Sequence, residues 1–231
     1  MSVSEVVALL AAMSNEERLE VFQTLRLRYG IAVHPLEADW NTTAEAILEA
    51  IHAAPDLTQR GVRGILAEAT FRTTVVPDRL PAWHAIPFEG DMPYDVLLDD
   101  GHGPLKVQVK NQRKERGQPK VIAKLSRAGG PPVYVAETQR TRSGQARGAD
   151  GEVTPTRPYR FGEFDILAVC LQPSSGRWTD FIYCPAHMLR ARDGKPELME
   201  VMQPIHSDGY GGWTFDFEDA AAAVRAHAEG R

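Results

Sequence analysis

The stretch MPYDVLLDDGHGPLKVQVKNQR, residues 92–113, decides how the fold of this chain is interpreted. It holds two short apolar segments, 94–98 and 106–109, which predict β-strands, and the Gly-His-Gly of 101–103 predicts a tight turn between them. Asp95 opens the first strand. Gln108 and Lys110 are two residues apart on the second strand, so we expect both side chains on one face.

These residue types suit one kind of chemistry. An acid and an amide oxygen at the ends of paired strands can hold Mg²⁺, and a neighbouring lysine can orient a water molecule. Hydrolysis of a phosphodiester bond needs such an arrangement.

Helical patterns precede this hairpin. Apolar residues recur at helical spacing over 4–28, where Ser14 and Glu17 predict a capping box and a break into two helices near Asn15. A second helical region is expected over 42–53. A third begins at Asp56, carries Glu68 and ends near Pro77 and Pro81. Its expected buried stripe is Leu57, Val62, Ile65, Leu66 and Ala69.

Strand patterns follow the hairpin. Residues 133–136 and 178–183 predict strands, and the nearly continuous apolar run 164–171 predicts a central one. Residues 138–160 are polar, rich in Gly and Arg and without periodicity, which predicts a long functional loop. Helices, then a mixed sheet, then a terminal helix indicate the α/β class. We expect an N-terminal helical region over 1–55 and a core domain over 56–231.

Charge is divided unevenly along a chain whose net charge is −5. Residues 1–60 hold 4 Lys/Arg and 9 Asp/Glu, a net charge of −5, whereas residues 106–160 hold 13 Lys/Arg and 4 acids, a net charge of +9. A local basic segment is typical of a protein that binds a polyanion. A solvated basic face is the alternative interpretation.

Asp95, Gln108-Val109-Lys110 and Glu68 on the preceding helix together resemble the PD-(D/E)XK nuclease superfamily, which has the restriction-endonuclease-like fold. The resemblance covers roughly residues 57–185 and keeps the order of the motif: glutamate on a helix, aspartate on a strand, acid-x-lysine on the next strand. It implies a central mixed β-sheet flanked by helices. Two departures stand out: Tyr94 separates Pro93 from Asp95, and Gln108 replaces the usual acid.

The resemblance also implies catalytic roles. Asp95 would bind Mg²⁺, Gln108 or the Val109 carbonyl would complete the metal's shell, and Glu68 would bind through water or hold a second metal. Lys110 would position or deprotonate the attacking water. Each residue also has a plainer interpretation, as a strand-end cap, an outward strand residue or an exposed helix acid.

Within this superfamily we expect a type II restriction endonuclease acting on double-stranded DNA as a homodimer, with the acidic N-terminal helices building the dimer interface. The expected DNA-binding residues lie in the basic segment: Arg113, Lys114, Arg116, Lys120, Lys124, Arg140, Arg142, Gln145, Arg147, Arg157 and Arg160. A repair nuclease, junction resolvase or homing endonuclease is the first alternative. A non-catalytic DNA-binding protein with the same fold is the second.

The remaining features predict an ordinary cytoplasmic protein. No run of about 18 apolar residues is present, and the N-terminus lacks the basic region of a signal peptide. Cys170 and Cys184 lie in apolar runs and are expected to be buried free thiols, although sequence does not decide against a disulfide. Asp99, Asp100 and His102 are expected in a turn, and Asp165 in a structural role.

Overall fold

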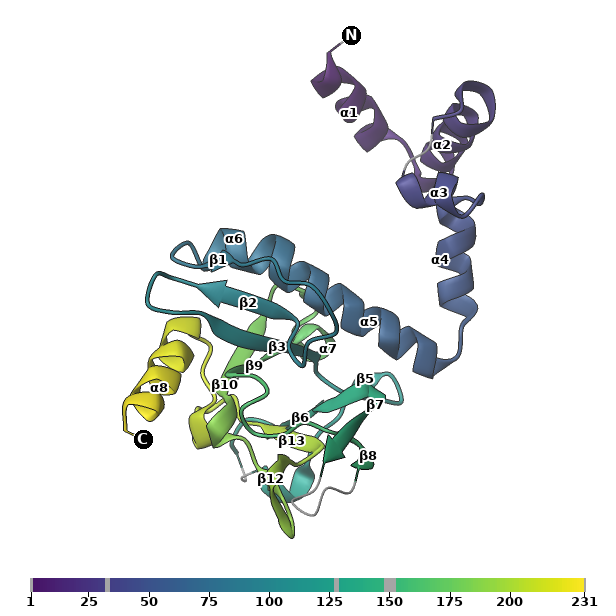
Figure 1. Cartoon of the computed structure of the whole chain (residues 1–231). Coiled ribbons are helices and arrows are strands. Elements are labelled where there is room, and N and C mark those ends of the chain that lie inside the picture. Colours follow the sequence, from purple (N-terminus) through teal and green to yellow (C-terminus); the bar gives the residue numbers. More distant parts are fainter. Residues whose placement is uncertain (1, 32–33, 127–128, 148–152, 231) are drawn as a thin grey trace. The chain divides into compact units, whose positions relative to one another are not determined.

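The computed structural model describes residues 2–31, 34–126, 129–147 and 153–230, and only the backbone of 141–147 and 153–157. The chain forms two compact units, Met1–Arg60 and Gly61–Arg231, and Figure 1 labels most of their elements. Every strand found among the described residues lies in the second unit.

The first unit is helical. Its helices are α1 (Val3–Ala12), α2 (Asn15–Tyr29), α3 (Pro35–Asp39) and α4 (Ala44–Ala53), and α5 (Asp56–Thr70) begins in it. The Ser14 side chain accepts a hydrogen bond from Glu17 N, and Glu17 accepts one from Ser14 N, which starts α2 where the capping box predicted. Helix α3 was not predicted from the sequence.

The interior of this first unit is polar. Glu37 is the one buried side chain among its described residues. Its carboxylate pairs with Arg26 Nε at 2.7 Å and accepts a hydrogen bond from Ala44 N at 2.7 Å. Arg26 also pairs with Glu45, on α4. An ion-pair network therefore joins α2, α3 and α4.

The second unit is built on a five-stranded mixed sheet in the order β1-β2-β3-β9-β10 (Figure 1). The strands are β1 (His84–Ala85), β2 (Val96–Asp99), β3 (Leu105–Asn111), β9 (Ile166–Cys170) and β10 (Phe181–Pro185). Strand β3 runs antiparallel to β2 and parallel to β9, and the other pairs are antiparallel. The predicted hairpin is thus β2–β3, and β9 is central as its apolar run predicted.

Alternation along the central strands divides the interior into two apolar clusters. Ile166, Ala168 and Cys170 pack with residues of α5, α6 (Val76–Arg79) and α8 (Phe217–Glu229) on one face of the sheet. Leu167 and Val169 face the other cluster. Both cysteines are buried and free. The predicted fold class, a central mixed sheet flanked by helices after an N-terminal helical region, is confirmed.

The buried stripe expected on α5 was wrong. Ile65 and Leu66 are exposed, whereas Ala67 and Phe71 are fully buried. The helical path does not stop at Thr70, because a π-helical turn (Phe71–Val75) leads directly into α6, with Pro77 in its first turn. The buried face of this helical segment therefore continues to Val75. The predicted stripe ended at Ala69.

The expected loop over 138–160 was also wrong in its local structure. Strands β7 (Gln139–Arg147) and β8 (Val153–Pro158) pair as an antiparallel ribbon with a register shift after Gln139. Neither strand belongs to the five-stranded sheet. Neither therefore needs one apolar face, and their sequences lack the alternation of polar and apolar residues that predicts a strand. The two strands pair with each other instead.

Shorter elements complete the second unit. They are β4 (Lys114–Glu115), β5 (Gln118–Pro119), β6 (Tyr134–Glu137), α7 (Gln172–Ser175), β11 (Ala191–Arg192), β12 (Lys195–Met199), β13 (Met202–Ile205) and 3₁₀ turns at Ala123–Leu125, Ala186–Met188 and Tyr210–Gly212. Strand β6 pairs with β13 and is joined to the end of β3 by a bridge between Gln112 and Ala136. None of the described helices is long and apolar enough to cross a membrane.

Candidate active site

The β2–β3 hairpin positions three of the four predicted catalytic residues. Asp95 directly precedes β2, and its backbone N–H donates to Val107 O at 3.0 Å. Gln108 and Lys110 lie on β3 with their partners Leu167 and Val169 in β9, so both belong to the same face of the sheet. The pairing of the two strands brings Asp95 against the middle of β3.

Hydrogen bonds from β3 hold the Asp95 carboxylate in place. Its Oδ2 accepts from Val109 N at 2.8 Å and from the Gln108 amide nitrogen. The same Gln108 nitrogen donates to Val109 O at 3.3 Å. The aspartate is thus fixed at one point on β3, and Gln108 is buried beside it.

Glu68, on α5, belongs to the same electrostatic cluster. Burial raises the pKa of its carboxyl group, and the charge of Asp95 raises it further, while Arg72 and Lys110 lower it. Arg72 Nη1 lies 3.6 Å from Glu68 Oε1, one helical turn along. The helix therefore supplies a second, partly exposed carboxylate to the site of Asp95.

Burial shifts the pKa values of the two acids and of the lysine in opposite directions. Burial raises the pKa of Asp95, which Lys110, the Val109 N–H and Gln108 partly offset. Burial lowers the pKa of Lys110, which the charges of Asp95 and Glu68 partly offset. Buried groups with perturbed pKa values that act on one another are typical of active sites.

Tyr159 lies against Lys110, and no motif in the sequence pointed to it. Lys110 Nζ is 3.4 Å from the Tyr159 hydroxyl oxygen and 5.4 Å from the ring centroid. Tyr159 directly follows β8 and is buried. Its position at the end of the basic segment is the one sequence signal that could have drawn attention to it.

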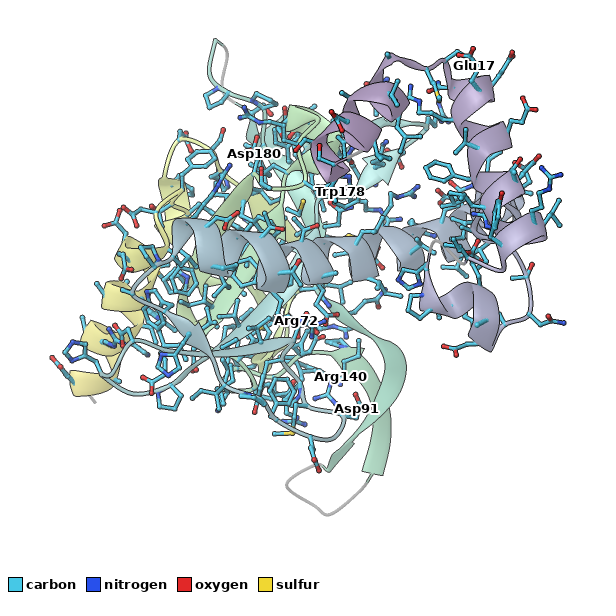
Figure 2. All side chains as sticks on the ribbon, turned by 90° about the horizontal axis from the view of Figure 1, so that it is seen from above. Glu17, Arg72, Asp91, Arg140, Trp178 and Asp180 are labelled. Carbon is cyan, nitrogen blue, oxygen red and sulfur yellow. The ribbon has the colours of Figure 1, made fainter. Side chains whose placement is uncertain are left out.

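A cleft of about 530 Å³ opens at the two carboxylates, Asp95 and Glu68. Glu68, Arg72, Asp91, Tyr94 and Asp95 line it, together with the apolar side chains of 85–88. Figure 2 labels Arg72, Asp91 and Arg140 at this side of the second unit. Asp91 adds a third acid to the rim of the cleft.

The oxygen donors at this site are of the type that a hard divalent cation takes, although only two of them are carboxylates. Among the described residues, no group of three or more His, Cys, Asp and Glu side chains is arranged to hold a metal ion. Asp95 and Glu68, with the neutral oxygens of Gln108 and Val109, would be the ligands, and partly buried carboxylates gain from a nearby positive charge. Gln108 turns its nitrogen to Asp95, so a cation shared by both requires a half-turn of the amide.

Several of the expected DNA-binding residues are engaged within the protein. Arg113 pairs with Glu137, and Arg140 with Glu163. Lys120 Nζ lies 3.2 Å from Glu115 Oε1 across the β4–β5 hairpin, where Lys114 is also placed. These ion pairs leave the side chains partly exposed.

The others are spread over the second unit. Arg116 occupies the β4–β5 turn with a φ of 50°, and Arg160 follows Tyr159. Lys124 lines a separate cavity of about 600 Å³ with Arg190, His206 and Trp213. The side chains of Arg142, Gln145, Arg147 and Arg157 lie outside the described residues.

The weaker candidates have structural partners. Asp165 Oδ2 accepts a hydrogen bond from Lys106 N at 2.8 Å, which ties the start of β9 to β3. Asp99 and Asp100 accept hydrogen bonds from the N–H groups of Gly101 and His102 in the turn after β2. Asp100 also pairs with Arg225, on α8.

Comparisons with known proteins do not identify a family for this chain, so its function has to be inferred from the site. No family model matches the sequence, and no curated protein matches it. The structure is similar to that of a bacterial homing endonuclease, I-Ssp6803I, at 15% sequence identity and a TM-score of 0.38, covering 73% of this chain and 95% of the other. A likeness this distant transfers no function.

Proposed function

We propose that this chain is a Mg²⁺-dependent endonuclease that hydrolyses phosphodiester bonds in double-stranded DNA. The observation that carries the proposal is that Glu68, on α5, and Asp95, just before β2, line one cleft, and that the charges of both act on Lys110, on β3. The resemblance to the PD-(D/E)XK superfamily predicts the same set of residues. We further propose a type II restriction enzyme.

Each residue has a distinct task in this proposal. Bound Mg²⁺ would supply positive charge to the phosphate oxygens and lower the pKa of a water molecule. Asp95 and Glu68 would hold the ion, with Gln108 and the Val109 carbonyl as neutral ligands. Lys110 orients the attacking water and offsets negative charge as the water adds to phosphorus and the leaving oxygen departs.

The rest of the second unit would bind DNA. The β7–β8 ribbon has the form of a two-stranded element that a major groove admits, and its sequence is rich in Arg and Gln, the residues that pair with guanine and adenine. The basic residues of 113–124 would contact phosphates. A homodimer would place two such sites on a palindrome.

A plasmid assay tests this proposal. Supercoiled plasmids of different sequence are incubated with the protein in Mg²⁺ and in EDTA, with Asp95→Ala and Lys110→Ala as matched controls. Discrete linear fragments in Mg²⁺ that neither variant produces would support a restriction enzyme. Cutting confined to branched DNA would indicate a resolvase, and a gel shift without cutting a binding protein.

A further inference from the structure

Lys110 has a tyrosine as its hydrogen-bond partner. Within the described residues, the contact of Nζ with the Tyr159 hydroxyl, at 3.4 Å, is the hydrogen bond that this ammonium group makes. The ammonium group also lies 5.4 Å from the centroid of the Tyr159 ring. A lysine side chain has four rotatable bonds and loses rotamer entropy when it is fixed, so a partner is needed to hold it.

Tyr159 is itself rigidly placed. The side chain is 4% exposed, and its ring packs edge-on against Phe164 with centroids 5.3 Å apart. The Arg140 guanidinium lies 5.6 Å from the same ring centroid and pairs with Glu163. Glu163 also accepts a hydrogen bond from Arg160 N at 2.9 Å.

These contacts lie at the base of the β7–β8 ribbon. Arg140 is the second residue of β7, and Tyr159 follows Pro158, which pairs with Gln139. One aromatic ring therefore touches a cation from the ribbon and the lysine of the candidate active site. Cation–ring contacts of this kind are attractive, because the face of an aromatic ring is electronegative.

We propose that Tyr159 is a positioning residue that holds the Lys110 ammonium group toward Asp95 and Glu68, and that Arg140 and Glu163 fix Tyr159 from the ribbon side. The assignment deepens the proposed function, because it concerns the same site. Tyr159 acts through Lys110 and does not touch the reacting atoms. It follows that a displacement at the base of the ribbon is passed to the lysine through this ring.

The restraint on the Lys110 side chain can be measured without any cleavage. The chain has six lysines: Lys106, Lys110, Lys114, Lys120, Lys124 and Lys195. In protein labelled with ¹³C-lysine, the aromatic ring should separate the ε-methylene NMR signal of Lys110 from the other five, and Lys110→Arg assigns it by deletion. The ¹³C order parameter of that signal measures how tightly the side chain is held, independently of the ring current. It should fall to the values of the other lysines in Tyr159→Leu and fall partway in Tyr159→Phe, which keeps the ring.

Cleavage supplies the second readout. Tyr159→Phe, which removes only the hydroxyl group, should lower the single-turnover rate on plasmid DNA about fivefold, the effect of a lost hydrogen bond. Tyr159→Leu should lower the rate about a hundredfold, because the lysine is displaced. The Kd for DNA in EDTA should remain within about twofold for both variants.

Tyr183→Phe is the matched control. Tyr183 is also 4% exposed, but it packs in the other cluster against Phe71 and Phe217. Loss of its hydroxyl group should leave both the order parameter of Lys110 and the cleavage rate unchanged. A general effect of removing a buried hydroxyl group would appear in both phenylalanine variants.

The outcomes separate this inference from the function on which it rests. If the wild-type protein does not cut DNA, the proposed function fails, and the order parameter of the Lys110 signal still decides whether Tyr159 holds the lysine. An unchanged Lys110 order parameter in folded Tyr159→Leu would overturn the inference. If that variant does not fold, a Tyr159→Phe rate equal to that of Tyr183→Phe would overturn it.

Discussion

Asp95 shows opposing forces acting on a single carboxyl group. Burial raises its pKa, although Lys110 and two hydrogen-bond donors on β3 stabilise the charged form. The donors therefore do not fully replace the water lost on folding. A site that keeps a carboxyl group with a raised pKa loses some stability, which is expected where activity requires that group.

Asp95→Asn should show the cost of burying the charged carboxylate as a pH-dependent change in stability. Because the folded pKa of Asp95 is raised, the folded state binds the proton more tightly, and this stabilisation is complete below the unfolded pKa of about 4. It is lost as the pH rises through the folded pKa. Asn carries no charge, so the variant should have a higher Tm than the wild type at pH 7.

Thermal unfolding of both proteins from pH 3 to pH 8 in EDTA measures the difference. The advantage of the variant should shrink as the pH falls toward 4. A variant that is less stable than the wild type at pH 7 would mean that the donors on β3 outweigh the cost of burial.

Gln108 is the residue where this chain departs from the family pattern. Gln108→Glu places a second carboxylate against Asp95 and removes the hydrogen bond that Gln108 donates. We expect a loss of about 1–3 kcal/mol in stability without metal. Mg²⁺ should restore that loss, and the concentration that gives half-maximal cleavage should fall below that of the wild type.

Gln108→Ala is the matched variant, because it removes the amide without adding charge. It should require more Mg²⁺ than the wild type or fail to cut. Tm and cleavage rate measured across a Mg²⁺ titration compare the three proteins. Superimposable curves would show that Gln108 does not contact the metal.

Residue spacing could reveal only part of the site. Asp95, Gln108 and Lys110 lie on neighbouring strands of one hairpin, so strand alternation and a short turn were enough to predict their proximity. Tyr159 could not be predicted in this way, because it is 49 residues from Lys110 and follows β8, which is not part of the five-stranded sheet.

At the scale of elements, sequence patterns succeeded where a face is buried. The central strand β9 and the hairpin β2–β3 were predicted because their side chains enter a core. The β7–β8 ribbon was missed because its strands pair only with each other. The buried stripe of α5 was misplaced because Ala67, Phe71 and Val75, four residues apart, face the core, whereas Ile65 and Leu66 face away from it; apolar residues lie on both faces, so periodicity alone did not choose the buried one.

The ribbon should dominate the electrostatics of DNA binding. Each phosphate contact releases counterions, so the log–log dependence of affinity on salt should be steep. Arg142→Gln and Arg147→Gln, in β7, should each reduce the slope by about 1 if the residue contacts phosphate, or relax specificity at a cost of about 1–3 kcal/mol if it contacts a base.

Arg192→Gln is the control for this experiment. Arg192 is an exposed arginine on the separate hairpin β11–β12. Binding of labelled duplex DNA is measured by fluorescence anisotropy at several salt concentrations. A slope near zero for the wild type would rule out an interface built on phosphate contacts.

At the scale of the whole molecule, the first unit lacks an apolar interior of its own. Its described residues bury no apolar side chain, and Val7 and Leu9 on α1 are exposed. Helical units of about 60 residues are marginal without a substantial core. We therefore expect this unit to form a homodimer interface. Its acidic composition disfavours contact with DNA and leaves it available for this role.

Light scattering during gel filtration measures the mass directly. The wild type should elute as a dimer, and Leu9→Glu should shift it toward the monomer by placing a charge in the interface. Ile65→Glu, at an exposed apolar residue in the second unit, should leave the mass unchanged. A monomeric wild type at micromolar concentration would refute the expected interface.

The rate of plasmid cleavage in Mg²⁺ by the wild type and by Asp95→Asn tests the central claim most directly. The asparagine keeps the size of the side chain and an oxygen that can accept from Val109 N, but it removes the charge that would bind the metal. We expect the wild type to cut and the variant to bind DNA with similar affinity without cutting. Cleavage by the variant at a rate near that of the wild type would contradict the assignment of this site.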